Sequence, residues 1–143
     1  MAGIKQIKLT PGIRRGTESL AKSWEKIVSH YKVCVENYHW RFEPMLDLVE
    51  SLAASSVADE LFPTTSMHTL LITDNEKFHH DDNVLFISYD PKKSEFDFEH
   101  KTLSGKNDRK TCGEKEVFQT LSLFLKYKFG VLFDPSLKIK RCP

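Results

Sequence analysis

Residues 84–99 have the sequence VLFISYDPKKSEFDFE, and this stretch decides the fold class. Val84–Tyr89 is an almost continuous apolar run, which is typical of a central strand. Asp90–Ser94 contains a proline, whose fixed φ and missing N–H favour a turn. Phe96 and Phe98 then alternate with carboxylates, as in a strand with one buried face and one solvated face. The stretch predicts an antiparallel β-hairpin.

The residues on either side extend this hairpin. Met67–Thr73 is apolar at its centre and flanked by threonines, which predicts a preceding strand. The polar segment Asp74–Asn83 is expected to be a loop, and Lys101–Cys112 a mobile connection. Short strands are also expected at Ile4–Leu9 and Val131–Phe133. Successive strands with short connections indicate a meander.

Three segments have apolar side chains at helical spacing. The first, residues 18–38, follows a candidate N-cap at Thr17, and the second covers residues 44–58. The third follows a capping-box pattern at Thr111–Glu114 and ends before Gly130. The apolar face of the first helix contains Leu20, Trp24, Ile27, Val28, Tyr31, Cys34, Val35 and Tyr38.

These elements predict an α+β fold with the order β-α-α-β-β-β-α-(β). About three helices would pack on an antiparallel meander of three to four strands. The length of 143 residues suits one domain that spans the whole chain, residues 1–143. Residues 1–10 and 136–143 are expected to fray.

Cysteine usage and hydropathy indicate the compartment. The three cysteines, Cys34, Cys112 and Cys142, are odd in number and far apart, which is typical of a reducing environment. No C-x-x-C pair predicts a structural zinc site. No apolar stretch is long enough to cross a membrane, and the N-terminus lacks the apolar run of a secretory signal. We therefore expect a cytoplasmic protein.

Charge is unevenly distributed along the chain. Residues 41–100 contain 13 acidic and 4 basic side chains, whereas both flanking segments are net basic. An exposed acidic face would attract a basic protein partner and speed its association. The alternative is that acidic and basic segments neutralise each other in the fold. The candidate partner-binding residues are Asp81, Asp82, Asp90, Glu95, Asp97 and Glu99.

In size, architecture and acidic strands the chain resembles small bacterial immunity or antitoxin-type proteins, although no motif carries this resemblance. The resemblance implies a non-catalytic domain that neutralises a protein partner by binding it. No cofactor or metal is expected under this hypothesis. Trp40, Arg41 and Phe42, between the first two helices, are either interface hot spots or core anchors.

Two other functions stay open. His79, His80 and Asp81 are metal-ligand types, so a metal-dependent hydrolase or nuclease is possible if other segments, such as those of His68 or His100, add ligands. Cys34 or Cys112 beside a distant histidine would suit nucleophilic catalysis. Nucleic-acid binding is the third hypothesis, through the basic residues Arg14, Arg15, Lys106, Arg109, Lys110, Lys138, Lys140 and Arg141.

Overall fold

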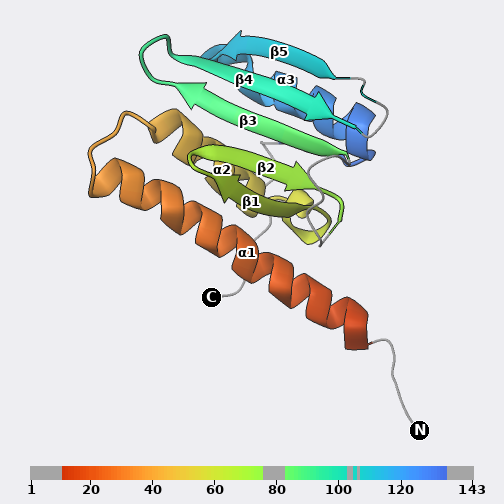
Figure 1. Cartoon of the computed structure of the whole chain (residues 1–143). Helices are drawn as coiled ribbons and strands as arrows, with labels where there is room; N and C mark the ends of the chain where they lie inside the picture. Colours follow the sequence, from red (N-terminus) through yellow and green to blue (C-terminus); the bar gives the residue numbers. More distant parts are fainter. Residues whose placement is uncertain (1–10, 76–82, 103–104, 106, 135–143) are drawn as a thin grey trace, which may run out of the picture.

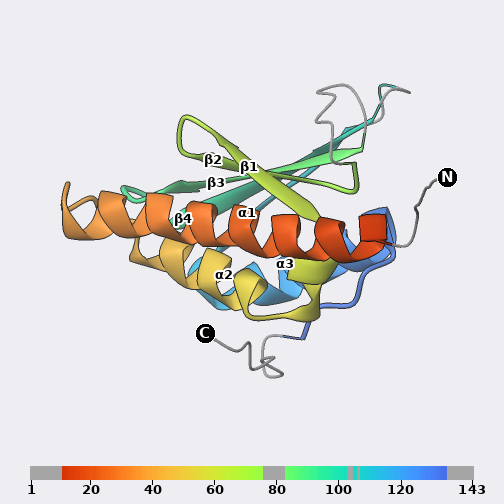
Figure 2. The same ribbon diagram turned by 90° about the horizontal axis from the view of Figure 1, so that it is seen from below.

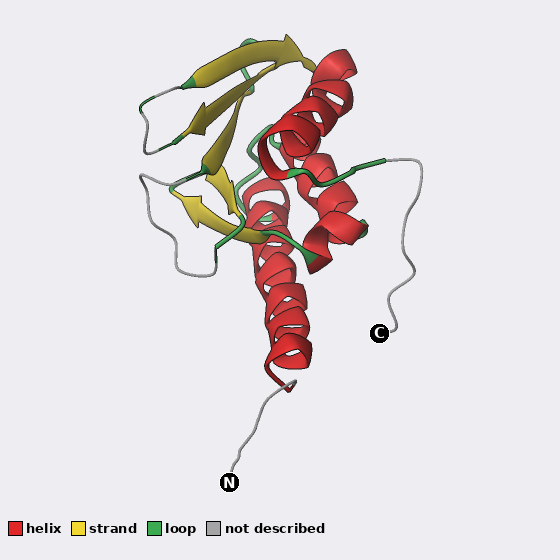
Figure 3. Ribbon diagram, turned by 90° about the vertical axis from the view of Figure 1, so that its right-hand side faces the viewer, coloured by secondary structure: helices red, strands yellow, loops and turns green. Residues whose placement is uncertain are grey.

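The computed structural model describes residues 11–75, 83–102, 105 and 107–134, with only the backbone for residues 11–19. Two layers are present, a five-stranded antiparallel sheet and a group of helices that covers one of its faces (Figure 1, Figure 3). The strands lie in chain order, β1-β2-β3-β4-β5, which is a meander. The predicted α+β class is confirmed, but the sheet has five strands where three to four were predicted.

Helix α1 spans Pro11–Glu36 and extends along the helical layer (Figure 2). It begins earlier than the predicted residue 18, at a proline, which loses no hydrogen bond in a first turn. Its apolar positions recur every three or four residues and are buried from Leu20 to Cys34. The indole Nε1–H of Trp24 donates to the carbonyl of Leu61 at 3.0 Å, which anchors the helix to the segment before the sheet.

The predicted second helix is divided in two. Helix α2 spans Glu43–Ala53, and a short 3-10 helix follows at Ser56–Asp59. Ser55 separates them, because its hydroxyl donates to Leu52 O at 2.8 Å and accepts the N–H of Val57 at 3.2 Å. A serine that bonds the local backbone in this way favours a helix boundary over a helix interior.

The third helical segment is also composite. A 3-10 helix at Glu114–Glu116 leads into α3, Val117–Phe124, and a π-helical turn at Leu125–Phe129 follows. Gly130 then has a left-handed φ of 68°, as predicted for a residue just past a helix end. The predicted capping box is wrong, because Thr111 belongs to a strand and the residue before the 3-10 helix is Gly113.

The central hairpin is confirmed. Strands β3, Val84–Asp90, and β4, Glu95–Lys101, pair with Ser88 opposite Asp97. The carboxylate of Asp90 accepts the N–H of Lys92 at 2.9 Å and supports the turn. Phe96 and Phe98 are fully buried on the side of the helices.

The two sheet edges account for the difference in strand number. Strand β2, Thr69–Thr73, is close to its predicted span, and β1, Phe62–Ser66, adds an edge strand. Strand β1 contains Pro63, and a proline is tolerated in an edge strand. Strand β5, Asp108–Gly113, forms the other edge within the segment that was predicted as a loop.

The remaining strand predictions have different outcomes. Val131–Phe133 was expected to form a strand, but residues 131–134 have no regular secondary structure, which corrects that prediction. Ile4–Leu9 and the end 136–143 lie outside the described residues.

The core lies between the two layers. Helices α1 and α2 contact each other beside β1, while α3 packs on β4 and β5. The rings of Phe98 and Phe124 stack with centroids 5.6 Å apart, which joins β4 to α3. Among the described residues, no helix combines the length and apolar character that a membrane crossing requires.

Candidate functional site

The predicted acidic surface is only partly described. Asp97 and Glu99 lie on the sheet face opposite the helices, because Phe96 and Phe98 occupy the other face of β4. Glu95 is exposed at the start of the strand. Asp90 is the last residue of β3, where the β3–β4 turn begins, and Asp81 and Asp82 lie outside the described residues. We call the surface formed by Ser88, Asp97, Glu99, Arg109 and Thr111 the open sheet face.

Cations from the same chain meet these carboxylates. The guanidinium Nε of Arg109 lies 2.9 Å from Asp97 Oδ1, and this contact raises the pKa of Arg109. Lys101 Nζ lies 4.0 Å from Glu99 Oε1. The open sheet face is therefore mixed in charge, and its role in docking a basic partner stays a prediction.

The residues of the two other hypotheses are largely outside the described part of the chain. His79, His80 and Asp81 are not described, and neither are Lys106, Lys138, Lys140, Arg141 or the side chains of Arg14 and Arg15. His100, one possible additional ligand, is buried near the β2–β3 connection, where its Nε2 lies 2.5 Å from Asn83 Oδ1. Burial and the nearby Lys128 lower its pKa. Both functions stay predictions.

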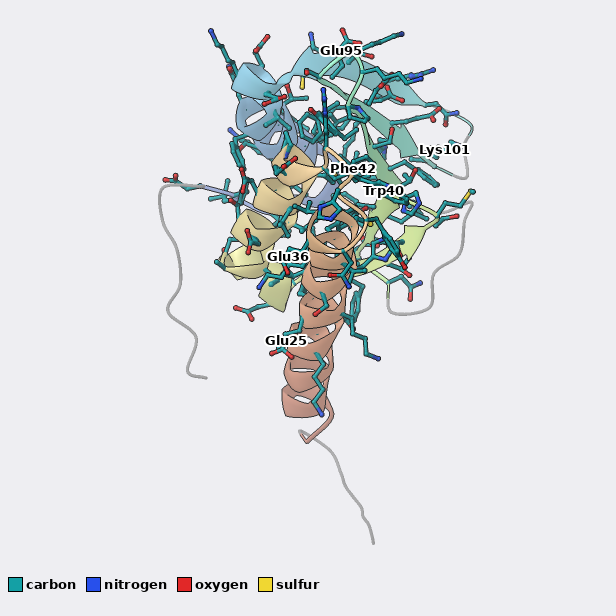
Figure 4. All side chains as sticks on the ribbon, turned by 90° about the vertical axis from the view of Figure 1, so that its left-hand side faces the viewer. Glu25, Glu36, Trp40, Phe42, Glu95 and Lys101 are labelled. Atoms are coloured by element: carbon teal, nitrogen blue, oxygen red, sulfur yellow. The ribbon has the colours of Figure 1, made fainter. Side chains whose placement is uncertain are left out.

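A pocket of about 470 Å³ lies at one end of the molecule, where three connections meet. These connections are the α1–α2 link, the β1–β2 turn and the β3–β4 turn. Figure 4 faces this end and shows Trp40 and Phe42 side by side near its centre. The pocket is lined by Trp40, Arg41, Phe42, His68, Pro91 and Lys92. Two aromatic rings, one imidazole ring and two cationic side chains therefore line this pocket.

Backbone geometry after α1 places Trp40 in this pocket. The final turn of the helix widens, since Tyr38 N–H donates to Val33 O and Trp40 N–H donates to Cys34 O. His39 between them adopts a left-handed φ of 55°. The chain thus turns back on the helix end, and the indole of Trp40 meets the ring of His68 edge to face at 4.5 Å.

The β1–β2 turn places His68. Ser66 pairs with Thr69, so Met67 and His68 form a two-residue hairpin loop. Met67 has a φ of 58°, a conformation that hairpin turns usually assign to glycine. The hydroxyl of Tyr31 donates to His68 O at 3.0 Å, and burial raises the pKa of this tyrosine, so the donor keeps its proton. Helix α1 therefore holds the turn.

Exposed apolar side chains lie near the pocket. The ring of Tyr38 contacts that of Trp40, Met67 precedes His68 in the β1–β2 turn, and Val33 lines a second pocket together with Tyr38 and His68. The exposed fractions are 40% for Val33, 61% for Tyr38, 38% for Trp40 and 86% for Met67. Phe42, in contrast, is a core residue at 9%. The sequence predicted either interface hot spots or core anchors for this aromatic pair. Phe42 is buried as a core anchor would be, whereas Trp40 is exposed and its role as a hot spot stays a prediction. We call the pocket and these exposed neighbours the aromatic end.

A second feature of the aromatic end is a cluster of His30, Cys34 and His68. One potential ligand atom from each residue lies within 4.8 Å of the other two. His30 Nε2 and His68 Nδ1 are buried and have no hydrogen-bond partner. Burial and the nearby His68 lower the pKa of His30, while burial raises the pKa of Cys34. Both effects favour the neutral forms of these side chains.

Sequence reasoning identified part of this cluster. His68 was considered as a ligand and Cys34 as a partner of a distant histidine, but His30 was missed. His30 and Cys34 are four residues apart in a helix, so they share a face. That spacing was the available signal. The approach of His68 depends on a tertiary contact that no local pattern encodes.

Comparison with known proteins gives no match: no family model, curated protein or solved structure is similar to this chain. The geometry of the aromatic end is therefore the basis for a functional conclusion.

Proposed function

We propose that the chain is a non-catalytic protein-binding domain that docks its partner on the aromatic end. The observation that carries this proposal is a pocket of about 470 Å³ lined by the exposed Trp40, with the exposed Tyr38 in ring contact with Trp40 and the exposed Met67 next to the lining residue His68. Binding hot spots are enriched in Trp, Tyr and Arg that fill or line pockets, and Trp40 and Arg41 line this one. Contiguous apolar exposure on a small domain is typical of an interaction surface.

The charge of the lining defines the partner's chemistry. Arg41 and Lys92 are permanent cations at the pocket, and its other members are His68, Pro91 and two aromatic rings. Such a lining favours an apolar side chain next to a carboxylate. The proposed partner segment is therefore acidic, with an apolar or aromatic anchor.

The proposal includes an immunity- or antitoxin-type role, in which the partner is a protein that the chain neutralises by binding. It also includes a cytoplasmic location, which is supported by the free and buried thiols of Cys34 and Cys112. The second candidate surface is the acidic one, where Asp97 and Glu99 lie together on β4 and would meet a basic partner. Their ion pairs with Arg109 and Lys101 favour the aromatic end over this surface.

The test is affinity capture followed by titration of the partner that is identified. Trp40→Ala should weaken its affinity by about 30-fold or more, since hot-spot truncations change binding by about 2 kcal/mol or more. Tyr127→Ala is the matched control, because Tyr127 is an exposed tyrosine on the turn after α3.

A combined Asp90→Asn, Glu95→Gln, Asp97→Asn and Glu99→Gln variant separates the two surfaces. Unchanged affinity in this variant, together with loss in Trp40→Ala, supports the aromatic end. Slower association with a flatter salt dependence, together with unchanged binding by Trp40→Ala, would transfer the proposal to the acidic surface.

A further inference from the structure

We propose that His30, Cys34 and His68 form a binding site for a zinc-class transition-metal ion. Two of the residues lie one turn apart on α1, and the third lies in the β1–β2 turn that packs against this helix. Their candidate ligand atoms lie within 4.8 Å of one another. This inference goes beyond partner binding and does not depend on it.

The two histidines present unused nitrogen atoms. His30 Nε2 and His68 Nδ1 are buried without a hydrogen-bond partner. Buried polar side-chain atoms nearly always have a partner, so each exception requires an explanation. Among the described residues there are three such atoms, and two of them occur in this cluster beside a thiol, while the third is His100 Nδ1. A shared ligand explains the two atoms of the cluster at once.

The imidazole ring of His30 is oriented by a contact of its other nitrogen, Nδ1, which directs Nε2 toward the cluster. The backbone of Met67 accepts a hydrogen bond from this histidine. With Nδ1 as the donor, the lone pair is on Nε2, which is the atom without a hydrogen-bond partner. Metal-binding histidines are held in this way, with one N–H donated to a carbonyl and the other nitrogen directed at the ion.

The turn that carries His68 is held equally firmly. The Tyr31 hydroxyl donates a hydrogen bond to the backbone carbonyl of His68 at 3.0 Å, and Trp40 packs against the imidazole ring of His68. The imidazole planes of His30 and His68 lie 24° from parallel with centroids 5.7 Å apart. Both rings are therefore positioned before any ion arrives.

The ligand set specifies the class of metal. Two imidazoles and a thiolate suit zinc and its neighbours in the first transition series, whereas magnesium and calcium require oxygen ligands. Around a tetrahedral zinc ion such ligand atoms lie roughly 3.3–3.8 Å apart. The ligand atoms lie within 4.8 Å of one another, so side-chain rotations that bring them closer by up to about 1.5 Å would complete the site.

Binding requires the Cys34 thiol to release its proton to solvent as the metal–sulfur bond forms. Three protein ligands leave a fourth position for water or for a group from a partner. The cluster lines a pocket of about 340 Å³ together with Ser29, Val33 and Tyr38, which gives such a group space beside the three ligands. The bound ion would tie the β1–β2 turn to α1.

The experiment titrates Co²⁺ into the reduced, metal-free full chain, because cobalt reports thiolate ligation by its absorption, and then displaces it with Zn²⁺. We expect one equivalent to bind with a sulfur-to-cobalt band. Cys34→Ser should abolish the band and weaken binding by more than about 100-fold, since even outer-shell partners contribute 10- to 100-fold. His30→Ala and His68→Ala should each weaken it to a similar degree.

Three control variants make the test specific. Cys112→Ser removes the other free buried thiol of the described residues, His39→Ala removes an exposed histidine near the same end, and His79→Ala with His80→Ala removes the adjacent histidine pair of the metal-hydrolase hypothesis. All three should bind as the original chain does. Zn²⁺ should raise the melting temperature of the original chain but not that of Cys34→Ser, whose metal-free melt and circular dichroism check its fold.

Two results would overturn the proposal. One is no saturable Co²⁺ or Zn²⁺ binding in the micromolar range. The other is binding that survives in Cys34→Ser or disappears in the His79 and His80 double variant, which would place the ion elsewhere.

Discussion

The aromatic end and the open sheet face differ in how many of their side chains have an ion-pair, hydrogen-bond or packing partner within the molecule. On the open sheet face, Asp97 meets Arg109 and Glu99 meets Lys101. At the aromatic end, two buried imidazole nitrogens have no partner and four apolar side chains are exposed. The described carboxylates of the open sheet face thus have partners within the chain, whereas several side chains of the aromatic end do not.

Backbone conformation shows the same contrast. Among the described residues, the non-glycine positions with positive φ are His39, Met67, Asn83 and Ser94. His39 and Met67 directly precede the pocket residues Trp40 and His68, and Ser94 belongs to the β3–β4 turn at the same end. Such conformations cost about 1–3 kcal/mol and cluster at functional sites. The aromatic end thus holds most of this local strain.

The largest stability effect that sharpens this comparison is expected from Tyr31→Phe. The change removes the hydroxyl that holds the β1–β2 turn and leaves His68 O without this donor. The free energy of unfolding should fall by about 1–2 kcal/mol in urea denaturation. Tyr38→Phe, at an exposed position, should leave it unchanged. Equal stability of the two variants would show that α1 does not hold the turn.

A smaller effect of opposite sign is expected from Met67→Gly. Glycine adopts the φ of 58° without a Cβ clash, and this methionine is exposed, so little packing is lost. The gain in unfolding free energy should be at most about 1 kcal/mol, because glycine also loses more backbone entropy on folding. Met67→Ala keeps the Cβ and should give no gain. A loss of stability in Met67→Gly would disprove strain at this turn.

The smallest effect is expected on the open sheet face, from Arg109→Gln. Its ion pair with Asp97 is exposed, so solvent and salt screen it. Urea denaturation should show a slight loss of stability at low salt that vanishes at about 1 M salt, where the screening length is about 3 Å. A large loss that persists at high salt would mean that this face is as structurally critical as the aromatic end.

The parts of the fold predicted from sequence have strong periodicity. The hairpin of β3 and β4 was found because a continuous apolar run, a proline turn and strict alternation agree. Strand β5, Asp108–Gly113, has only Cys112 as an apolar member, so its pattern resembles a loop. Strand β1 contains Pro63, which argues against a central strand but not against an edge. Edge strands bury few apolar side chains. Hydrophobic periodicity is visible in a sequence only where one face of an element is buried, so these two strands give little signal.

The candidate site was less predictable for a different reason. Trp40, Arg41 and Phe42 were singled out by residue type, but Pro91 and Lys92 join them only through the packing of separate turns. The cluster of His30, Cys34 and His68 similarly combines a helical spacing with a hairpin contact 37 residues away, that of Tyr31 with His68. Sequence supplies the residue types, and tertiary contacts decide which of them meet.

The two edge strands also bear on self-association. An open sheet has unpaired N–H and C=O groups at both edges, which another copy can extend into a continuous intermolecular sheet. Pro63 removes a donor from β1, and Arg109 and Lys110 place like charges along β5, where a second copy would bring the same charges. The polar composition of β5 makes the strand hard to recognise from hydrophobic periodicity. The same composition disfavours edge-to-edge pairing between copies of the chain during folding.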